Sequence, residues 1–468
     1  MTERAATTTR ARWMPSPAVA GAIVVGVVGV AAAFVMSRFE PALVGIPLLL
    51  CAAWDWDRRP AAVETPGRPE TTEDAAPAPT EARVDAVDIT TAVTTHAGGD
   101  GDAAGRVGGA AIDILVAASA TQRPDALHLR LGLGGAAPVD AVVTPRAAAE
   151  LRSAVPIVHS GPQRVAAVEV RAIGADAAWV SLPSDEAVVE RVVRPRRAPL
   201  RSLPLPARLL GLTGQHISTR PGNGGEFRDI DLFHPGDRLR RIDWKATARA
   251  GRGADLYVRR TTATSDAAVH LVLDARDDVS AVVADWPRAY PRPAVSSLDL
   301  AREAASSLAA AYTGAADRVG FDDLGEPRRV LPPRAGARHR ERVLRAIEAT
   351  AANGAPFTRV RSPRLAPGSI VFVLSTFLDD QPVALALTWR ATGHRVIAVD
   401  VLPARDGREL PARDRLALRA IELERALRLE QLQAGGVELL VWQDPALREA
   451  ALRALASGPG RVSGRGRR

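Results

Sequence analysis

Two side chains stand at the ends of apolar runs and could hold a ligand through oxygen atoms. Asp274 closes one such run, and Ser375 closes another. If the runs are parallel strands, ligands bind beyond their carboxyl ends, so these positions are the first places to look for chemistry. Asp274 could then work with Asp278 and His234 in a metal-dependent hydrolase. This enzyme is the alternative to the interpretation developed below.

A second candidate site is the segment Gly224–Gly251, where basic residues surround a Pro-Gly-Asp turn. Three interpretations stay open. Its charges could pair internally and fix a junction, because buried charges persist only when they are paired. The cluster could instead dock onto an acidic partner, or its arginines and turn amides could bind an anion such as phosphate. The internal pairing would join the acidic residues to the basic ones, namely Glu226, Asp237 and Asp243 to Arg240, Lys245 and Arg249.

The turn also predicts the local structure of this segment. Asp237 can cap a short helix that carries Leu239 and Ile242 on one side, and Trp244 is expected to pack inward. The arginines then project around the other side of the helix, at Arg238, Arg240 and Arg241. Lys245 is the only lysine in the chain, which marks a position where a compact ammonium could differ in role from a planar guanidinium.

Several classes of enzyme lack their sequence signature here. The chain has no Gly-x-x-x-x-Gly-Lys-Ser/Thr loop for nucleotide hydrolysis and no Gly-x-Ser-x-Gly context for a serine nucleophile. Its one cysteine, Cys51, and its scattered histidines give neither zinc spacing nor a disulfide framework. We therefore expect a protein that is not an enzyme and that carries no cofactor.

The distribution of charge argues against a nucleic-acid partner. Lys and Arg number 61 against 53 Asp and Glu, a net charge of +8. The last eight residues carry four arginines and no acid, and the first twelve carry three arginines against Glu3. Because the ends hold most of the excess, the body of the chain is close to neutral. No basic face for duplex binding is expected.

Two apolar segments near the N-terminus indicate a membrane hairpin over residues 17–56. Residues 17–36 carry no charge, and 20 helical residues span roughly the 30 Å of a hydrocarbon layer. A second apolar segment follows a four-residue link and contains Pro47. Arginines before and after the hairpin outnumber the single one in the link, so both ends are expected in the cytoplasm. A cleaved signal peptide is the competing interpretation.

After the hairpin the composition changes twice. Residues 57–81 are rich in Pro, Ala, Thr and Glu without apolar periodicity, which is typical of a flexible linker. Short alternating segments, divided by Gly, Pro and Asp, then predict a small antiparallel β-sandwich over residues 82–197. Four of these segments are AAIDILVAA, ALHLRLGLG, RVAAVEVRAIG and AVVERVVRP.

The C-terminal part alternates compact apolar strands with helical periodicity. This alternation predicts a doubly wound α/β domain over residues 263–456, with a parallel sheet covered on both faces. The expected strands are Ala268–Asp274, Arg318–Phe321, Ser369–Ser375, Arg395–Leu402 and Gly436–Trp442. The expected helices are Leu298–Tyr312, Arg338–Ala351, Pro382–Thr392 and Arg413–Leu432. Residues 1–16 are expected to be a cytoplasmic terminus, and residues 457–468 a disordered basic tail.

The runs VHLVLDARDDVS, DRVGF and IVFVLSTFLDD resemble a von Willebrand factor type A domain. With the preceding segment and the hairpin, the chain resembles the bacterial domain-of-unknown-function family fifty-eight. The hallmark of that family lies within residues 198–262 and is matched at Glu226, Phe227, Pro235, Gly236, Asp237, Arg240, Ile242, Asp243, Trp244, Ala248 and Arg249. Asp231 and Phe233 depart from it, since the family usually has Arg and Tyr there. An arginine-mediated contact at Asp231 is therefore in doubt.

The resemblance implies a metal site in its intact form. Type A domains often hold Mg²⁺ through an Asp-x-Ser-x-Ser loop, with a Thr and an Asp from neighbouring loops. With Asp274 as the first position, Arg276 and Asp278 stand in the two serine places, and Thr376 stands where Asp is usual. A guanidinium at a ligand position repels a divalent cation, so we expect Asp274 to pair with Arg276 and Mg²⁺ to be absent. Asp379 and Asp380 could supply oxygen atoms from nearby, but the Leu-Asp-Asp run that contains them is more simply interpreted as a helix N-cap.

The resemblance also implies a partner, because such proteins are commonly associated with MoxR-type AAA+ ATPases. We therefore expect a membrane-anchored interaction or adaptor protein, which contacts the lipid bilayer and faces the cytoplasm. Trp286 and Tyr290, in the proline-rich loop after Asp274, could add an interaction surface or could simply cover the edge of the sheet.

Overall fold

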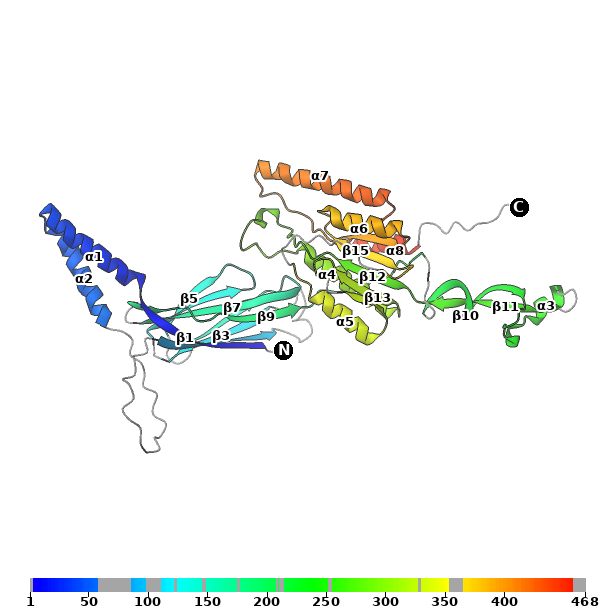
Figure 1. Ribbon diagram of the computed structural model, residues 1–468, viewed down its shortest axis with the longest axis horizontal. Coiled ribbons are helices and arrows are strands. Elements are labelled where there is room, and N and C mark those ends of the chain that lie inside the picture. Colours follow the sequence, from blue (N-terminus) through cyan, green and yellow to red (C-terminus); the bar gives the residue numbers. More distant parts are fainter. Residues whose placement is uncertain are drawn as a thin grey trace, which may run out of the picture. The chain divides into compact units, whose positions relative to one another are not determined.

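The computed structural model describes residues 3–57, 86–97, 111–121, 124–144, 149–174, 177–207, 209, 214–250, 255–326, 330–352 and 365–457. The chain divides into two compact units, the first of residues 1–157 with 163–191 and the second of residues 158–162 with 192–468 (Figure 1). Apart from the first residue of each, the linker expected at 57–81 and the tail expected at 457–468 lie outside the described residues.

Two apolar helices follow the first strand. Helix α1 (Pro17–Met36) has proline in its first turn and ends at Ser37, and helix α2 (Glu40–Asp57) contains Pro47. The helices lie side by side, because glycines let their backbones approach: a Cβ atom on Gly45 would lie 2.7 Å from the carbonyl oxygen of Gly26 (Figure 1). By length and composition α1 could cross a membrane, whereas α2 contributes a shorter apolar helix.

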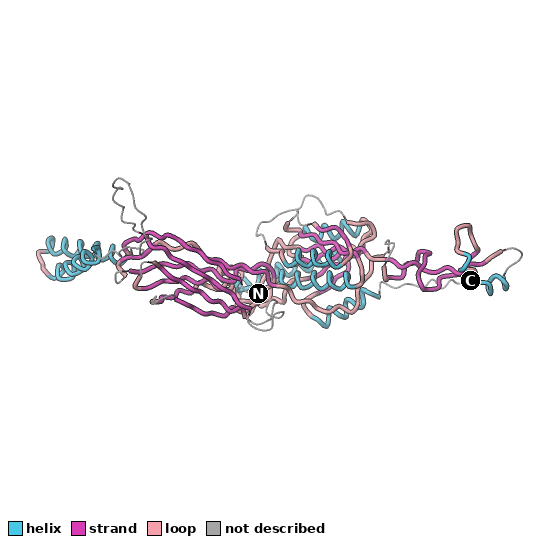
Figure 2. The backbone as a smooth tube through the Cα atoms, turned by 90° about the horizontal axis from the view of Figure 1, so that it is seen from below, coloured by secondary structure: helices cyan, strands magenta, loops and turns pink. Residues whose placement is uncertain are grey.

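Strands paired in antiparallel fashion form the rest of the first unit (Figure 2). Their order is β5-β4-β7-β8-β1-β2-β3-β6, and β9 pairs with β7. The bounds are β1 Glu3–Pro15, β2 Ala86–Ala97, β3 Ile112–Ala120, β4 Ala126–Leu133, β5 Val139–Val143, β6 Ala149–Val155, β7 Gly161–Gly174, β8 Trp179–Ser181 and β9 Ala187–Val193. Alternate residues are buried, such as Val87 and Ile89 in β2 and Ile112 and Ile114 in β3, as period-two alternation predicts.

Strand β1 differs from the sequence-based expectation. Residues 1–16 were expected outside the sandwich, but Glu3–Pro15 lies within the sheet, between β8 and β2. The run ERAATTTRARWMP has no large apolar side chain before Trp13, and alternation of charged with apolar residues begins only at Arg10. Most of the run therefore gives no pattern that predicts a strand. Its buried apolar side chains come only near its end, at Ala11 and Trp13.

A six-stranded sheet lies at the centre of the second unit (Figure 1). Its order is β14-β13-β12-β15-β16-β17, with β14 antiparallel and the other pairs parallel. The bounds are β12 Ala268–Leu273, β13 Arg318–Asp323, β14 Leu331–Arg334, β15 Ile370–Ser375, β16 Arg395–Asp400 and β17 Glu438–Val441. Every residue of β12 and β15 is buried, which explains why these strands read as continuous apolar runs.

Helices cover both faces of this sheet. On one face α4, α5 and α8 share a core with Val269 and Leu271, and on the other α6 and α7 share a core with Val371 and Val373. The bounds are η2 Val283–Asp285, α4 Ser297–Gly314, α5 Ala337–Glu348, α6 Asp380–Ala391, α7 Ala412–Ala434 and α8 Pro445–Ser457. The alternation of strands and helices read from the sequence is therefore present, and the domain has helices on both sides of a mostly parallel sheet.

A two-stranded arm precedes this sheet in the chain and carries the hallmark residues. Strand β10 (His216–Leu232) pairs antiparallel with β11 (Tyr257–Ser265), with three shifts of register. Between them lie the single-turn helix η1 (Leu239–Arg241) and the short helix α3 (Trp244–Ala250) (Figure 1). We call residues 227–250 and 255–260 the arm tip.

Candidate functional site

Asp274 and Ser375 lie at the carboxyl edge of the six-stranded sheet, as the sequence predicts, and the structure brings them into contact. Strands β12 and β15 are neighbours, and the order of the strands reverses between them. Such a reversal is where doubly wound folds bind ligands. The hydroxyl of Ser375 donates a hydrogen bond of 2.8 Å to Asp274 Oδ2. The two residues therefore form one site.

The guanidinium of Arg276 fills this site. Its Nε lies 2.7 Å from Asp274 Oδ1, and its Nη2 lies 2.9 Å from Asp274 Oδ2. Nη2 also lies 2.8 Å from Asp379 Oδ2, and Nη1 lies 2.6 Å from Gln381 Oε1. Burial would lower the pKa of Arg276, but its hydrogen bonds to Asp274 and the charges of both carboxylates outweigh burial and raise that pKa. The predicted pair of Asp274 and Arg276 is present.

The other positions of the degenerate metal loop have separate partners. Asp278 Oδ1 accepts a hydrogen bond of 3.1 Å from a backbone N–H in the first turn of α4. The carbonyl oxygen of Thr376 accepts one of 2.7 Å from Arg425 Nε. Asp379 caps α6, as the Leu-Asp-Asp run predicts. A magnesium ion needs an octahedral set of oxygen ligands, so these donors, with a guanidinium among them, do not fit Mg²⁺.

Asp277 adds a carboxylate that sequence analysis did not single out. Burial and the negative charges of Asp274 and Asp379 raise its pKa, although Arg276 acts in the opposite direction. Two carboxylates therefore bind the guanidinium of Arg276, and the charge of a third, Asp277, interacts with the same group. A loop with an acid on either side of an arginine was the available signal, but only the fold brings Asp379 to it.

The residues of the alternative hydrolase are engaged in separate local contacts. His234 belongs to the arm, where its Nδ1 lies 2.8 Å from the carbonyl oxygen of Leu232. Asp278 binds the start of α4, and Asp274 binds Arg276. A general base and a metal ligand must converge on one substrate position. The contacts of these three residues do not provide that convergence.

The Pro-Gly-Asp turn of the arm forms, but Asp237 does not cap a helix as predicted. Its Oδ2 accepts a hydrogen bond of 2.9 Å from the backbone N–H of His234 and closes the turn. Helix η1 has no side-chain cap. Asp243 is the capping residue, because its Oδ1 accepts hydrogen bonds of 3.1 and 2.9 Å from two backbone N–H groups in the first turn of α3.

Large apolar side chains of the arm tip face solvent. Trp244 is 67 % exposed, Leu239 is 69 % exposed and Phe227 is 50 % exposed. The predicted inward packing of Trp244 is therefore wrong. Ile242 takes the buried position and forms a bridge with Val258, which is also buried. A two-stranded arm has too few elements to cover all of its apolar side chains.

One interpretation predicted that Asp237 and Asp243 pair with basic side chains of the tip. The two carboxylates instead accept hydrogen bonds from backbone N–H groups. Within the described residues, five cationic side chains of the tip have no ion pair or hydrogen bond: Arg238, Arg240, Lys245, Arg249 and Arg259. The guanidinium of Arg259 lies over the ring of Phe227, 5.0 Å from its centroid. The side chain of Glu226 lies outside the described set. Asp231, where the family usually has Arg, forms an ion pair of 2.7 Å with Arg260.

The base of the arm is fixed by a buried carboxylate that sequence analysis missed. Both oxygens of Asp317 lie 2.9 Å from His216 Nε2 at the start of β10. Asp317 Oδ1 also accepts a hydrogen bond of 2.8 Å from the backbone N–H of Ala267, just before β12. Asp317 has no exposed surface. One side chain therefore binds both the start of β10 and a residue of the link that joins β11 to β12, where the arm meets the α/β domain.

Trp286 and Tyr290 lie on the loop between β12 and α4. The indole Nε1 of Trp286 donates a hydrogen bond of 2.9 Å to a backbone carbonyl of the same loop, and both aromatic side chains remain partly exposed. The buried Asp285 holds the loop by accepting hydrogen bonds from Arg292, which also pairs with Glu409. The loop is thus a fixed part of the carboxyl edge, with aromatic surface on it.

A clamp at the start of α4 was also missed by sequence analysis. His159 Nδ1 lies 2.8 Å from Asp299 Oδ2, and Asp299 Oδ1 accepts hydrogen bonds of 2.7 and 3.0 Å from the N–H and the hydroxyl of Ser160. The hydrogen bond to Asp299 raises the pKa of His159. Burial alone would raise the pKa of Asp299, but His159 and backbone amides bring it below its ordinary value. The Ser160 hydroxyl binds the carboxylate and not the imidazole, so this is no nucleophile and base pair.

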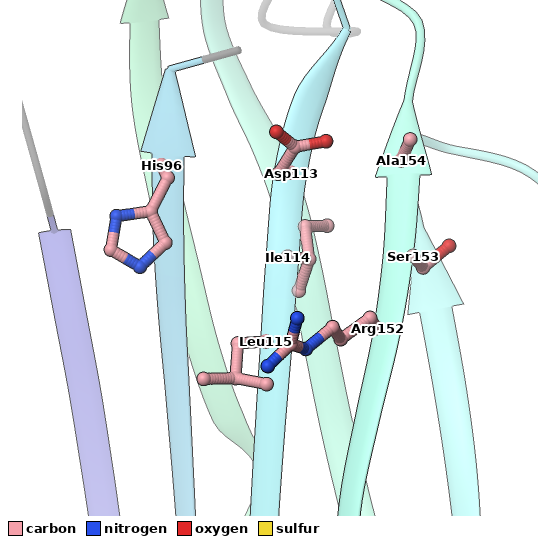
Figure 3. A pocket seen from close by; sticks show the side chains of 7 residues that line it. All are labelled: His96, Asp113, Ile114, Leu115, Arg152, Ser153 and Ala154. Atoms are coloured by element: carbon pink, nitrogen blue, oxygen red, sulfur yellow. The ribbon is translucent and has the colours of Figure 1, made fainter.

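A surface hollow of about 600 Å³ lies on strands β2, β3 and β6 of the first unit (Figure 3). His96 faces Asp113 across one strand pair, and Arg152 faces Leu115 across the next. These are side chains of both charges on the solvent face of a sheet, where polar residues are expected. We assign no function to this hollow.

Comparisons with known proteins agree with the hallmark of the arm. The family described as "Protein of unknown function DUF58" matches residues 229–435. "Uncharacterized protein Rv1480" of Mycobacterium tuberculosis (strain ATCC 25618 / H37Rv) and "Uncharacterized protein Mb1516" of Mycobacterium bovis are each 30 % identical over 256 residues, which are 53 % of this chain and 72 % of theirs. No solved structure matches significantly. The chain belongs to the DUF58 family of proteins of unknown function.

Proposed function

We propose that this chain is a membrane-anchored interaction protein without catalytic activity of its own, and that the arm tip docks onto an acidic protein partner. One observation carries the proposal: the exposed Trp244 lies among basic side chains that have no acidic partner in the described residues. Tryptophan and arginine are the residue types that contribute most to binding at protein interfaces. The proposed partner class, from family resemblance, is a MoxR-type AAA+ ATPase.

The charges of the arm tip favour a protein surface over a phosphate ligand. A phosphate pocket needs free backbone N–H groups that converge on the anion. In the tip, the amide of His234 is bound by Asp237, and the first amides of α3 are bound by Asp243. The cations remain available to a broad acidic surface. Electrostatic attraction between two such surfaces speeds their association, and it weakens as salt is added.

The α/β domain is proposed to be a von Willebrand factor type A-like module that acts by contact. Its strands, numbered along the chain from β12, have the order 3-2-1-4-5-6 of a doubly wound fold, with the third strand antiparallel. The edge where such a module could hold a cation carries the guanidinium of Arg276. Contact through side chains, rather than through a shared metal ion, is therefore the proposed mode of binding.

Membrane anchorage through α1 and α2, with both units in the cytoplasm, completes the proposal. Helix α1 is long and apolar enough to cross, and only Val19 and Gly26 are buried among its 20 residues. A core helix of a soluble protein would be largely buried, so this apolar surface requires another apolar environment. The arginine distribution supports the cytoplasmic side.

The test is affinity purification of the tagged full chain from detergent-solubilised membranes, with quantitative mass spectrometry of the proteins that copurify. The double variant Leu239→Ala/Trp244→Ala removes the apolar part of the tip. Trp286→Ala is the matched control, because it removes a partly exposed tryptophan from another surface. We expect the double variant, with an unchanged melting temperature, to lose an acidic partner that the control retains.

A charge-reversal pair separates the electrostatic part of the surface. Arg240→Glu/Lys245→Glu should reduce recovery of that partner more than Arg240→Ala/Lys245→Ala does. Wild type should recover more of the partner than the alanine variant does, and added salt should make this difference in recovery smaller. Equal recovery of every partner with all of these variants would remove the arm tip from the interface. Turnover of a small molecule by the purified chain would overturn the non-enzymatic part.

A further inference from the structure

The strand β1 runs almost directly into the first apolar helix. Ser16 is the single residue between β1 and α1, and its backbone N–H donates a hydrogen bond of 2.8 Å to the carbonyl oxygen of Ala178, next to β8. Pro17 then begins the helix. The end of the sheet and the start of α1 are therefore coupled without a flexible linker.

β1 has neighbours on both sides. On one side it pairs with β2 over ten positions, from Glu3 opposite Thr95 to Arg12 opposite Ala86. On the other side, Trp13 to Pro15 pair with β8. Ala11 and Trp13 are buried in the core of the unit. Removal of β1 would leave the edges of β2 and β8 unpaired and would expose this part of the core.

We propose that β1 makes α1 and α2 a permanent bilayer anchor whose two ends lie on the same side of the membrane. This inference rests on the proposed membrane anchorage. A leader cleaved after α1 would take β1 with it and open the sheet. The competing signal peptide is therefore disfavoured by the fold itself, and not only by the length of the apolar run.

The pairing of β1 with β2 also assigns a role to α2. β1 precedes α1 and β2 follows α2, so a chain that leaves the sheet through α1 must return to the same sheet. Residues 58–85 are too polar to cross a hydrocarbon layer, which leaves α2 as the returning segment. Its 18 residues can return because they pack closely on α1 at Gly26, Gly29 and Gly45, as small residues allow between helices in lipid.

The surface that this anchor offers is apolar on the outside. Val24, Val28, Phe34 and Leu43 are among the large side chains that point away from the helix pair and are exposed. Hydrocarbon is the partner that such a surface fits. Because one residue joins β1 to α1, the adjoining end of the sheet lies at the headgroup layer, and the unit is held against the membrane surface.

The first test traps β1 in its pairing. Thr8 and Thr90 are exposed opposite residues of β1 and β2, and their Oγ1 atoms lie 3.2 Å apart. Thr8→Cys/Thr90→Cys in a Cys51→Ser background should form a disulfide upon mild oxidation of intact membranes, because the Cβ atoms are within bonding reach. Thr8→Cys/Thr94→Cys is the control, since position 94 lies about 13 Å further along the strand. A disulfide in the first variant alone supports the inference, and its absence, or equal yields, overturns it.

The second test places the link between the helices. Ser37→Cys, also in the Cys51→Ser background, should react with a membrane-impermeant maleimide only from the face opposite to the one that exposes an added C-terminal cysteine. Labelling of both from the same face would overturn the return through α2. Alkaline extraction of the membranes tests the proposed anchorage separately, because it releases proteins that do not span the bilayer. A chain that stays in the membrane but forms no β1–β2 disulfide would keep the proposed anchorage. It would contradict only the inference that β1 holds both ends of the helix pair on the same side.

Discussion

Arg276 and Asp274, two residues apart in one loop, form two hydrogen bonds between their side chains, of 2.7 and 2.9 Å, at the carboxyl edge of the sheet. Their side chains are only 9 % and 5 % exposed. A buried carboxylate requires a positive charge nearby, and here the chain supplies that charge itself. The point at which a doubly wound fold could hold a cation is therefore satisfied from within.

Arg276→Ala should lower the free energy of unfolding by about 3–5 kcal/mol, because it leaves the buried carboxylate of Asp274 without a counter-charge. Thermal denaturation of the detergent-solubilised full chain, followed by circular dichroism, measures the loss. Arg408→Ala is the matched control. It breaks the ion pair between Arg408 and Asp406, in which the side chain of Arg408 is 89 % exposed. The melting temperature should stay nearly unchanged, because exposed ion pairs contribute little to stability.

The same variant distinguishes a self-contained site from a metal site. Mg²⁺ should raise the melting temperature of Arg276→Ala, since the cation can take the place of the guanidinium beside Asp274 and Asp379. It should have no effect on the wild-type chain. Stabilisation of the wild type by Mg²⁺, lost in Asp274→Ala, would contradict this account and restore the metal-dependent alternative.

Two substitutions in the arm tip should differ in their effect on stability. Asp243→Ala removes the cap of α3 and should destabilise the arm by about 1 kcal/mol. Arg240→Ala removes a side chain without a partner in the described residues and should leave the melting temperature unchanged while weakening recovery of the partner. A clear drop in melting temperature with Arg240→Ala would show that the arginine serves the fold, and would return the cluster to a structural junction.

The α/β domain was readable from the sequence because burial on both faces leaves a strong pattern. β12 and β15 are apolar at nearly every position, and helical periodicity separates them from their neighbours. The local pair of Asp274 and Arg276 was predictable for a similar reason, since two residues of one loop need no knowledge of the fold. Asp379 could not be assigned to that pair, because it reaches Arg276 only through the pairing of β12 with β15.

The arm and β1 were harder to predict because their burial leaves no regular pattern of apolar residues in the sequence. Trp244 is apolar and was expected inside, yet an arm of two strands has little interior to offer. In one interpretation Asp237 and Asp243 were expected to pair with basic side chains. They instead accept hydrogen bonds from backbone N–H groups of a turn and of a helix start, which lie within three residues of them in the sequence. β1 finds its partner across some 80 residues, so only its own weak alternation could have indicated it.

The clamp of His159 and Asp299 predicts a pH dependence of stability. The pKa of His159 is raised, so its contribution is complete below its ordinary value of 6.5 and is lost as pH rises through the raised value. The pKa of Asp299 is lowered, so its contribution is complete above 3.8 and is lost as pH falls through the lowered value. The difference in melting temperature between wild type and His159→Gln should be greatest between pH 3.8 and 6.5. A difference that stays constant through alkaline pH would contradict the ion pair.

The tie at the base of the arm predicts that Asp317 controls how firmly the arm is held. Asp317→Ala leaves the backbone N–H of Ala267 and the ring of His216 without their buried acceptor, which should cost about 1–3 kcal/mol. Asp317→Asn keeps an acceptor oxygen for Ala267 and should cost less. Limited proteolysis reports the local effect: cleavage within the arm should rise more steeply than global unfolding in Asp317→Ala. The contrary outcome is an arm that is cleaved no faster in Asp317→Ala than in wild type when the two are compared at equal global stability. Asp317 would then stabilise the domain without holding the arm, and only the pairing of β10 with β11 would keep the docking surface in place.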